Sequence, residues 1–162
     1  MKPLTRRLFL PALAAAGVLF LGMRSLASRA ADGPGFTLSD EQWRKKLAPE
    51  AYTVLRHEGT EAPFSSPLDH LTKHGVYHCA GCDLAVYSSK TKYDSGTGWP
   101  SFYAPLAKAV QTKTDISLGM PRTEVHCATC GGHLGHVFDD GPRPTGQRHC
   151  INGVALTFAP KD

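Results

Sequence analysis

Short blocks in which apolar and polar residues alternate occupy most of the chain after residue 75, and this pattern predicts β-strands. The expected strands cover residues 76–78, 84–87, 125–126 and 133–138, followed by a final strand in which Val154, Leu156 and Phe158 alternate. The alternation indicates that the last strand buries one face. Cys150 is then expected at or just before the start of that final strand.

Helical signals are confined to a short stretch before the strands. Ser39 and Gln42 have the spacing of a capping box, so a helix that carries Trp43 should begin near Asp40. Pro49 suits the first turn of a second short helix. Residues 59–71 are rich in turn formers. The predicted fold class is therefore all-β: a small two-sheet, β-tent-like domain with short N-terminal helices.

The first 30 residues have the order of an export signal. Arg6 and Arg7 precede an uncharged apolar run over residues 8–23, and small residues follow around Ala30. Paired arginines before the apolar run indicate the twin-arginine route, with cleavage after Ala30. This predicts a periplasmic or otherwise exported protein. The alternative is an uncleaved membrane anchor, for which the apolar run is slightly short of the roughly 20 residues of a membrane span.

Length and charge limit the number of domains and the kinds of partner expected for the rest of the chain. Residues 31–38 are expected to form a linker and residues 39–162 a single domain. The whole chain has a net charge of +4, but residues 1–30 hold five basic residues and no acidic one, so 13 basic and 14 acidic residues remain, a net charge of −1. No basic patch remains for phosphate neutralisation, so we expect no nucleic-acid partner.

Four of the five cysteines form two Cys-x-x-Cys pairs, Cys79 with Cys82 and Cys127 with Cys130. Each pair lies between two predicted strands, at a hairpin tip. Four thiolates satisfy a closed tetrahedral zinc site, which is structural because no coordination position stays open. The twin-arginine route would allow the chain to fold around zinc before export. The alternative is two short-loop disulfides.

Cys150 remains as a lone thiol. It can be a buried, inert cysteine or a nucleophile, and its neighbours favour the second. Arg148 and Asn152 lie two positions away on the same side of an extended chain. His133 and His136 can face the same pocket only if a turn or bulge at residues 134–135 breaks the alternation. Each could instead be a structural histidine, while a zinc-ligand role is unfavourable beside four thiolates.

Two further groups of residues are ambiguous. Trp99 lies in a rigid segment with two glycines and a proline, where it can form an apolar wall or pack in the core. His78, His126 and His149 adjoin cysteines directly, and we interpret them as strand residues whose side chains point to the opposite face. A turn-rich loop over residues 139–146 can bring His136 and Cys150 together.

Together these segments resemble the B-type methionine sulfoxide reductases, which act on the R epimer. The resembling stretches are RHEGTEAPF (56–64), YHCAGC (77–82), KYDSGTGWPSF (92–102), RTEV (122–125), HLGHVFDDGP (133–142) and RHCIN (148–152). The resemblance implies a two-sheet β fold, a distal zinc held by Cys79, Cys82, Cys127 and Cys130, a nucleophile at Cys150, and pocket residues Trp99, His133, His136 and Asn152. It also implies oxidised proteins as substrates and an enzyme that acts as a monomer.

The mechanism implied by this resemblance starts with attack of Cys150 on the sulfoxide sulfur and ends with a sulfenic acid on Cys150. His133 and His136 would position the oxygen and supply the proton. Asn152 and Arg148 would orient or polarise the sulfoxide, and Trp99 would hold the S-methyl group.

The chain departs from many relatives at two positions. Thr97 stands where they have a cysteine, so no internal resolving thiol is evident and an external thiol reductant is expected. His149 stands where an aromatic residue usually precedes the nucleophile. Two other classes of function remain to be compared: a zinc-ribbon binding module without catalysis, and a Cys-His hydrolase, which needs an oxyanion hole and an oriented imidazole.

Overall fold

The two predicted helices form where the sequence supplies their first turns. In the computed structural model, α1 (Asp40–Lys46) follows Ser39, whose hydroxyl accepts a hydrogen bond from the Gln42 amide at 3.3 Å. The Gln42 side chain accepts in turn from the Ser39 amide at 2.7 Å, which completes the capping box. The second helix, α2 (Pro49–His57), begins on the proline and ends at Glu58 in the left-handed conformation.

The structure describes residues 36–161. The predicted export signal and most of the predicted linker lie outside this range. Among the described residues, no helix has the length and apolarity needed to cross a membrane.

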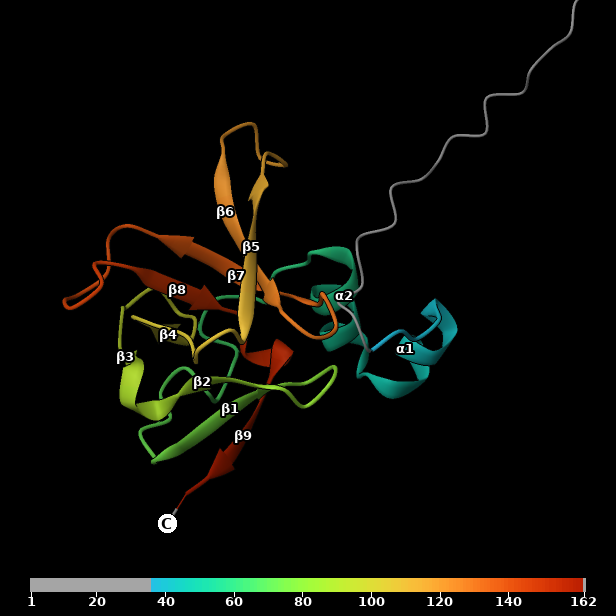
Figure 1. Ribbon diagram of the computed structural model, residues 1–162, viewed down its shortest axis with the longest axis horizontal. Helices are drawn as coiled ribbons and strands as arrows, with labels where there is room; N and C mark the ends of the chain where they lie inside the picture. Colours follow the sequence, from blue (N-terminus) through green and yellow to red (C-terminus); the bar gives the residue numbers. More distant parts are fainter. Residues whose placement is uncertain (1–35, 162) are drawn as a thin grey trace, which may run out of the picture.

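Within residues 36–161, nine strands form two antiparallel sheets, which confirms the predicted all-β, two-sheet fold (Figure 1). The three-stranded sheet has the order β2-β1-β9 and the six-stranded sheet the order β3-β4-β8-β7-β6-β5. The strands are β1 (Gly75–Cys79), β2 (Ala85–Ser88), β3 (Lys92–Tyr93), β4 (Ser101–Phe102), β5 (Val110–Asp115), β6 (Arg122–Cys127), β7 (His133–Phe138), β8 (Arg148–Ile151) and β9 (Leu156–Pro160). Short 3₁₀ turns, η1 (Ser89–Thr91) and η2 (Gly153–Ala155), join β2 to β3 and β8 to β9.

The prediction for Cys150 needs a correction. The final strand is β9, which begins at Leu156, and Val154 belongs to the η2 turn before it. Cys150 lies in a separate strand, β8, of the other sheet. The alternation from Val154 to Phe158 concealed this break, because Val154 of the η2 turn continues the sequence alternation of Leu156 and Phe158 in β9. Besides β8, three strands escaped prediction: β3 and β4 have two residues each, and β5 is a largely polar edge strand.

The bulge expected at residues 134–135 is present. Val125 of β6 pairs with Gly135, and the next residue of β6, His126, pairs with His133, so Leu134 is the extra residue on β7. Gly135 lies against β8 so closely that a β-carbon built on it would be 2.1 Å from the Cys150 carbonyl oxygen. The bulge and the glycine therefore fix how β7 passes the strand that carries Cys150.

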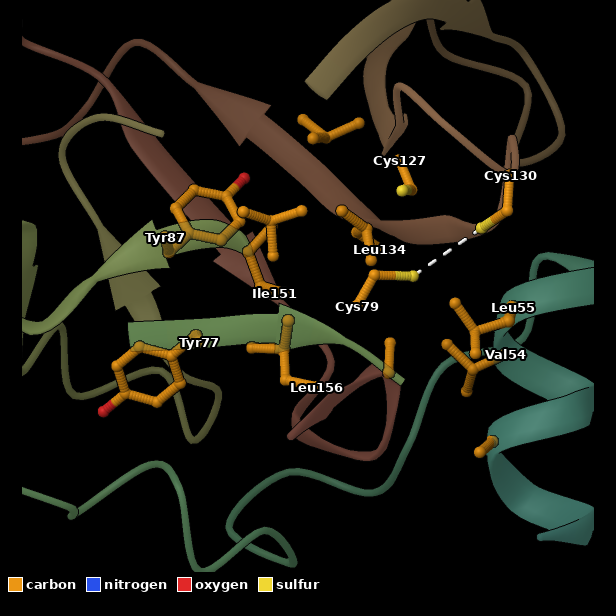
Figure 2. Packing of buried hydrophobic residues seen from close by; sticks show 14 of the residues in the cluster. Val54, Leu55, Tyr77, Cys79, Tyr87, Cys127, Cys130, Leu134, Ile151 and Leu156 are labelled. Atoms are coloured by element: carbon orange, nitrogen blue, oxygen red, sulfur yellow. Dashed lines mark hydrogen bonds between the residues drawn. The ribbon is translucent and has the colours of Figure 1, made fainter. Parts of the chain in front are cut away.

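The core lies between the two sheets (Figure 2). Tyr87 of β2 stacks on Phe102 of β4 with ring centroids 4.4 Å apart, and Tyr77 of β1 meets the same Phe102 ring edge-on at 5.0 Å. Leu134 and Ile151 are fully buried beside them. Because these rings and side chains come from both sheets, their packing holds the six-stranded sheet against the smaller sheet.

Candidate active site and cysteine cluster

The four paired cysteines meet as predicted. Their sulfur atoms all lie within 4.8 Å of one another, with Cys79 Sγ 3.7 Å from Cys130 Sγ and Cys82 Sγ 3.5 Å from Cys127 Sγ. Ligands 2.3 Å from a tetrahedral zinc ion are roughly 3.8 Å apart. The cluster could therefore hold one zinc ion, and all five cysteines are free of disulfides.

The two Cys-x-x-Cys turns share one backbone design. In the first turn, the Asp83 amide donates to the Cys79 carbonyl at 2.8 Å, and Asp83 has a φ of 64°. In the second, the Gly131 amide donates to the Cys127 carbonyl at 3.0 Å, and Gly131 has a φ of 67°. A left-handed residue four positions after the first cysteine thus closes each turn and leaves both sulfur atoms facing the other turn.

Cys150 lines a small pocket on a different part of the six-stranded sheet. We call this the Trp99 pocket; it has a volume of about 140 Å³. It is lined by Thr60, Trp99, Arg122, Gly135, His136, Phe138, Cys150 and Asn152. His136 is the direct cross-strand partner of Cys150, in agreement with the prediction that the 139–146 loop brings them together. Pockets that enclose whole small molecules measure roughly 300–1,000 Å³, so this one suits the end of a side chain.

Both predicted histidines are oriented by carboxylates. The His133 Nδ1 lies 2.9 Å from Glu124 Oε1, and the His136 Nε2 lies 2.7 Å from Asp115 Oδ2. Because an ionised carboxylate only accepts, each of these ring nitrogens carries a proton, and the hydrogen bond fixes the orientation of each ring. The two rings are 5.4 Å apart between centroids and meet edge to face.

The carboxylates are themselves held by cations. The buried Glu124 accepts from Lys113 at 2.9 Å. Burial alone would raise the pKa of Glu124, but the hydrogen bonds from His133 and Lys113 outweigh it, so this pKa is lowered. Hydrogen bonds from Ser117 are the leading cause of the lowered pKa of Asp115. The same Asp115 oxygen that binds His136 is 2.5 Å from Arg122 Nη2. Both carboxylates therefore stay ionised near neutral pH.

Burial shifts the pKa values of His136 and Cys150 in opposite directions. It lowers the pKa of His136, with the Asp115 hydrogen bond offsetting only part of the shift. It raises the pKa of Cys150, with Thr97 and Arg148 acting in the other direction. Both groups are thus neutral in the resting site at pH 7.

The effect of the Arg148 charge on Cys150 is partly cancelled by a neighbouring carboxylate. The Arg148 guanidinium makes two 2.8 Å bonds to the Asp140 carboxylate and stacks 4.5 Å above the Phe138 ring. The Asp140 charge also raises the pKa of Cys150 and so opposes Arg148. Arg148 reaches the thiol from outside the Trp99 pocket, whose lining does not include it.

Asn152 and Trp99 are anchored to one loop. The Asn152 side chain donates to the Leu134 carbonyl at 3.1 Å and accepts from the Glu61 amide at 3.0 Å, so both ends of its amide group contact backbone. The Trp99 indole donates to the Glu61 carbonyl at 3.2 Å. Glu61 in turn accepts from the amides of Gly153 and Val154. These bonds fix the residue 60–62 segment over the pocket.

His149 has its side chain in the core on the other face of β8, as expected for a strand residue beside Cys150. It is 4% exposed, and its Nδ1 lies 3.1 Å from the Tyr87 hydroxyl. Burial lowers its pKa to about 4, so it is neutral at pH 7. The departure at this position therefore changes the core under the nucleophile and not the edge of the pocket.

Sequence reasoning missed the partners of the histidines: Asp115, Arg122 and Glu124. Asp115, the last residue of β5, pairs with Arg122, the first residue of β6, next to the turn of this hairpin. Glu124 lies opposite His136. The resembling stretch RTEV contains two of them, but only the pairing of β5, β6 and β7 shows which histidine each one meets. The available signal was an Arg and a Glu two positions apart, just before the strand predicted at residues 125–126.

The fold and site define a two-sheet β protein that has a four-cysteine, zinc-type cluster and, separately, a lone thiol beside oriented imidazoles. The SelR domain family model matches residues 47–160. Curated relatives named peptide methionine sulfoxide reductase MsrB are 52% identical in Agrobacterium fabrum, 56% in Pseudomonas syringae pv. syringae and 55% in Methanosarcina barkeri. The matches cover 78%, 75% and 74% of this chain and 95%, 93% and 85% of those relatives. This chain belongs to the SelR family.

The cysteine cluster generates the first prediction. Cys127→Ser should lose bound zinc and lower the denaturation temperature, because structural metal binding contributes directly to folding free energy. Metal analysis and thermal unfolding of the purified protein measure both effects. Cys150→Ser is the matched control and should keep its zinc. A wild-type protein with two disulfides and no zinc would contradict the prediction.

The charges around Cys150 generate the second prediction. Asp140→Asn should lower the pKa of Cys150, because it removes a negative charge that disfavours the thiolate and leaves Arg148 in place. The alkylation rate of Cys150, measured against pH, should therefore rise at lower pH than in the wild type. Asp139→Asn, at the exposed neighbouring position, should leave the profile unchanged. A shift to higher pH in Asp140→Asn would contradict the prediction that the Asp140 charge disfavours the Cys150 thiolate.

Proposed function

We propose that this chain reduces methionine-R-sulfoxide, mainly in oxidised proteins, to methionine. The observation that carries this proposal is Cys150 in the small Trp99 pocket, directly across from the carboxylate-bound His136. Family membership supports it, since the relatives are named for this activity. A pocket of about 140 Å³ admits the end of one methionine sulfoxide side chain, which suits a protein-bound substrate.

The reaction uses the thiol as a two-electron reductant. Cys150 gives up its proton, and its sulfur attacks the sulfoxide sulfur while the sulfoxide oxygen takes up a proton. The sulfur–sulfur bond formed by this attack and the sulfur–oxygen bond of the substrate then break as the oxygen bonds to Cys150 Sγ, so methionine leaves and Cys150 becomes a sulfenic acid. The substrate sulfur is reduced by two electrons and the cysteine sulfur is oxidised by two.

The two imidazoles suit both proton movements. The nitrogens of His133 and His136 that do not face carboxylates can accept the Cys150 proton and return it to the sulfoxide oxygen. The His133 Nε2 is buried and has no partner among the described residues. Asp115 and Glu124 stabilise the imidazolium that forms between the two steps. Trp99 and Phe138 supply apolar surface for the S-methyl group, while Asn152 positions the loop above.

Recycling requires a thiol from outside the chain. Thr97, 3.9 Å from Cys150 Sγ, occupies the position of the cysteine found in many relatives. The other four cysteines belong to the cluster, which we propose binds a structural zinc ion. The donor attacks the sulfenic acid, a mixed disulfide forms, and a second thiol restores Cys150.

The two rival functions fit the site less well. A zinc-ribbon binding module leaves the carboxylate-oriented histidines and the Trp99 pocket without a role. A Cys-His hydrolase gains support from the oriented imidazoles but lacks oxyanion donors on the strand of the nucleophile. The amides of Ile151 and Asn152, which follow Cys150, already donate to the Pro100 and Leu134 carbonyls at 2.9 Å.

The proposed location follows from the sequence of residues 1–30 alone. A twin-arginine signal would export the domain already folded around zinc, where a reduced cysteine cluster would otherwise be at risk of oxidation. Oxidised periplasmic proteins would then be the substrates, and a monomer would be sufficient for catalysis because all the residues invoked come from one chain.

The third prediction tests the nucleophile. Cys150→Ser should lose reduction of methionine-R-sulfoxide, because a hydroxyl cannot be oxidised to the sulfenic acid that completes the reaction. Methionine release from a sulfoxide-containing peptide measures the loss. The variant should retain its zinc and its unfolding temperature, which separates loss of chemistry from loss of fold. Activity at the wild-type level would refute the mechanism.

The fourth prediction concerns the proton relay. His136→Ala and His133→Ala should each lower the rate of methionine formation by a factor on the order of 10² to 10⁴, the range for lost acid–base assistance. Single-turnover kinetics isolate this step from recycling. His70→Ala, at an exposed histidine, is the control and should leave the rate unchanged. Wild-type rates in both relay variants would mean that solvent supplies the proton.

A further inference from the structure

A second pocket adjoins the nucleophile from outside the Trp99 pocket. We call it the Thr97 pocket; it measures about 440 Å³. Its lining consists of Tyr93, Asp94, Ser95, Thr97, Asp140, Gly141, Pro142 and Arg148. It shares no lining residue with the Trp99 pocket. Two of its residues nevertheless act on Cys150: the Thr97 hydroxyl is 3.9 Å from Sγ, and the charge of Arg148 lowers the pKa of the thiol.

The wall between this pocket and Cys150 is rigid. The Thr97 hydroxyl is 2.8 Å from the Ser95 hydroxyl, which is 2.7 Å from the Ser101 hydroxyl of β4. Ser101 is the cross-strand partner of Cys150. Elsewhere in the lining, Asp140 fixes Arg148 through two bonds. The hydroxyl of Tyr93 has no hydrogen-bond partner among the described residues and is an unused donor.

The chemistry of recycling requires an approach from a second side. Reduction of the sulfoxide leaves the new oxygen of Cys150 directed into the Trp99 pocket, where the substrate lay. A thiolate that displaces this oxygen must enter in line with the sulfur–oxygen bond and opposite to it. The substrate pocket therefore cannot serve the donor, whereas a pocket that reaches Sγ past Thr97 can.

We propose that the Thr97 pocket is the entry site for the external thiol donor. The inference rests on the proposed function. The donor sulfur bonds to Cys150 Sγ as the sulfur–oxygen bond breaks, and the oxygen leaves as water with a proton from the donor thiol or the solvent. A second thiol then attacks the donor sulfur of the mixed disulfide, which releases Cys150 as a thiol and the donor as a disulfide.

Charge at this pocket makes the inference testable. Asp140 is paired with Arg148, whereas the exposed Asp94 carboxylate accepts a hydrogen bond from the Gly96 amide at 2.9 Å and, within the described residues, has Lys92 as a more distant Coulombic neighbour but no direct ion pair. A negative charge at the rim without a direct ion pair attracts cationic thiols and repels anionic ones. Asp94→Asn keeps the acceptor for Gly96 and removes only the charge.

The experiment follows the decay of the Cys150 sulfenic acid, preformed with methionine-R-sulfoxide, after mixing with cysteamine, 2-mercaptoethanol or 2-mercaptoethanesulfonate. Rates are compared per thiolate. In Asp94→Asn, the ratio of the anionic to the cationic thiol rate should rise about threefold, and the effect should fade with added salt. Glu50→Gln, at an exposed position outside the pocket, should leave the ratio unchanged. An unchanged ratio in Asp94→Asn would overturn the inference.

A steric variant separates the entry site from the fold and from the reaction itself. Pro142→Trp should slow sulfenic acid decay at least tenfold with thioredoxin, a protein thiol, and less with 2-mercaptoethanol. Arg143→Trp, next to it but outside the lining, should not. Equal decay in both variants would contradict the inference, whereas absence of the first methionine in the wild type would contradict the proposed function instead.

Discussion

The contact between Cys79 and Cys130 joins the end of β1, in the small sheet, to the turn before β7, in the large one. The same cluster reaches the helices, because Arg56 of α2 donates to the Cys130 carbonyl at 3.0 Å. Three residues after Cys130, β7 begins at His133. A metal ion that held four thiolates at this junction would therefore set both the packing of the sheets and the starting point of the strand that carries both histidines.

From that starting point, strand pairing places the chemistry. The bulge at Leu134 brings His133 and His136 to one side of the strand, where an uninterrupted strand would separate them. Gly135 allows β8 to lie close enough for Cys150 to face His136. The carboxylates of Glu124 and Asp115 come from the neighbouring strands β6 and β5. The site is thus built on paired strands, whose geometry is more rigid than that of loops.

Much of this could be predicted from the sequence, because the signals were local. The capping box, the proline before α2, the two Cys-x-x-Cys turns and the lone Cys150 each depend on spacing within a few residues. The partners of the histidines could not, because Asp115 meets His136 only through the β5–β6–β7 register. The β8–β9 break was missed because a 3₁₀ turn preserved the apolar alternation. Charge neutralisation of Arg148 by Asp140 likewise requires the folded loop.

The central claim is that one thiol in one small pocket reduces one epimer of methionine sulfoxide. Single turnover of the pure R and S epimers, in a peptide and without added reductant, tests it most directly. The account predicts about one methionine per chain from the R epimer, a trappable sulfenic acid on Cys150, and no methionine from the S epimer. Equal yields from both epimers, or a yield from the S epimer alone, would contradict it.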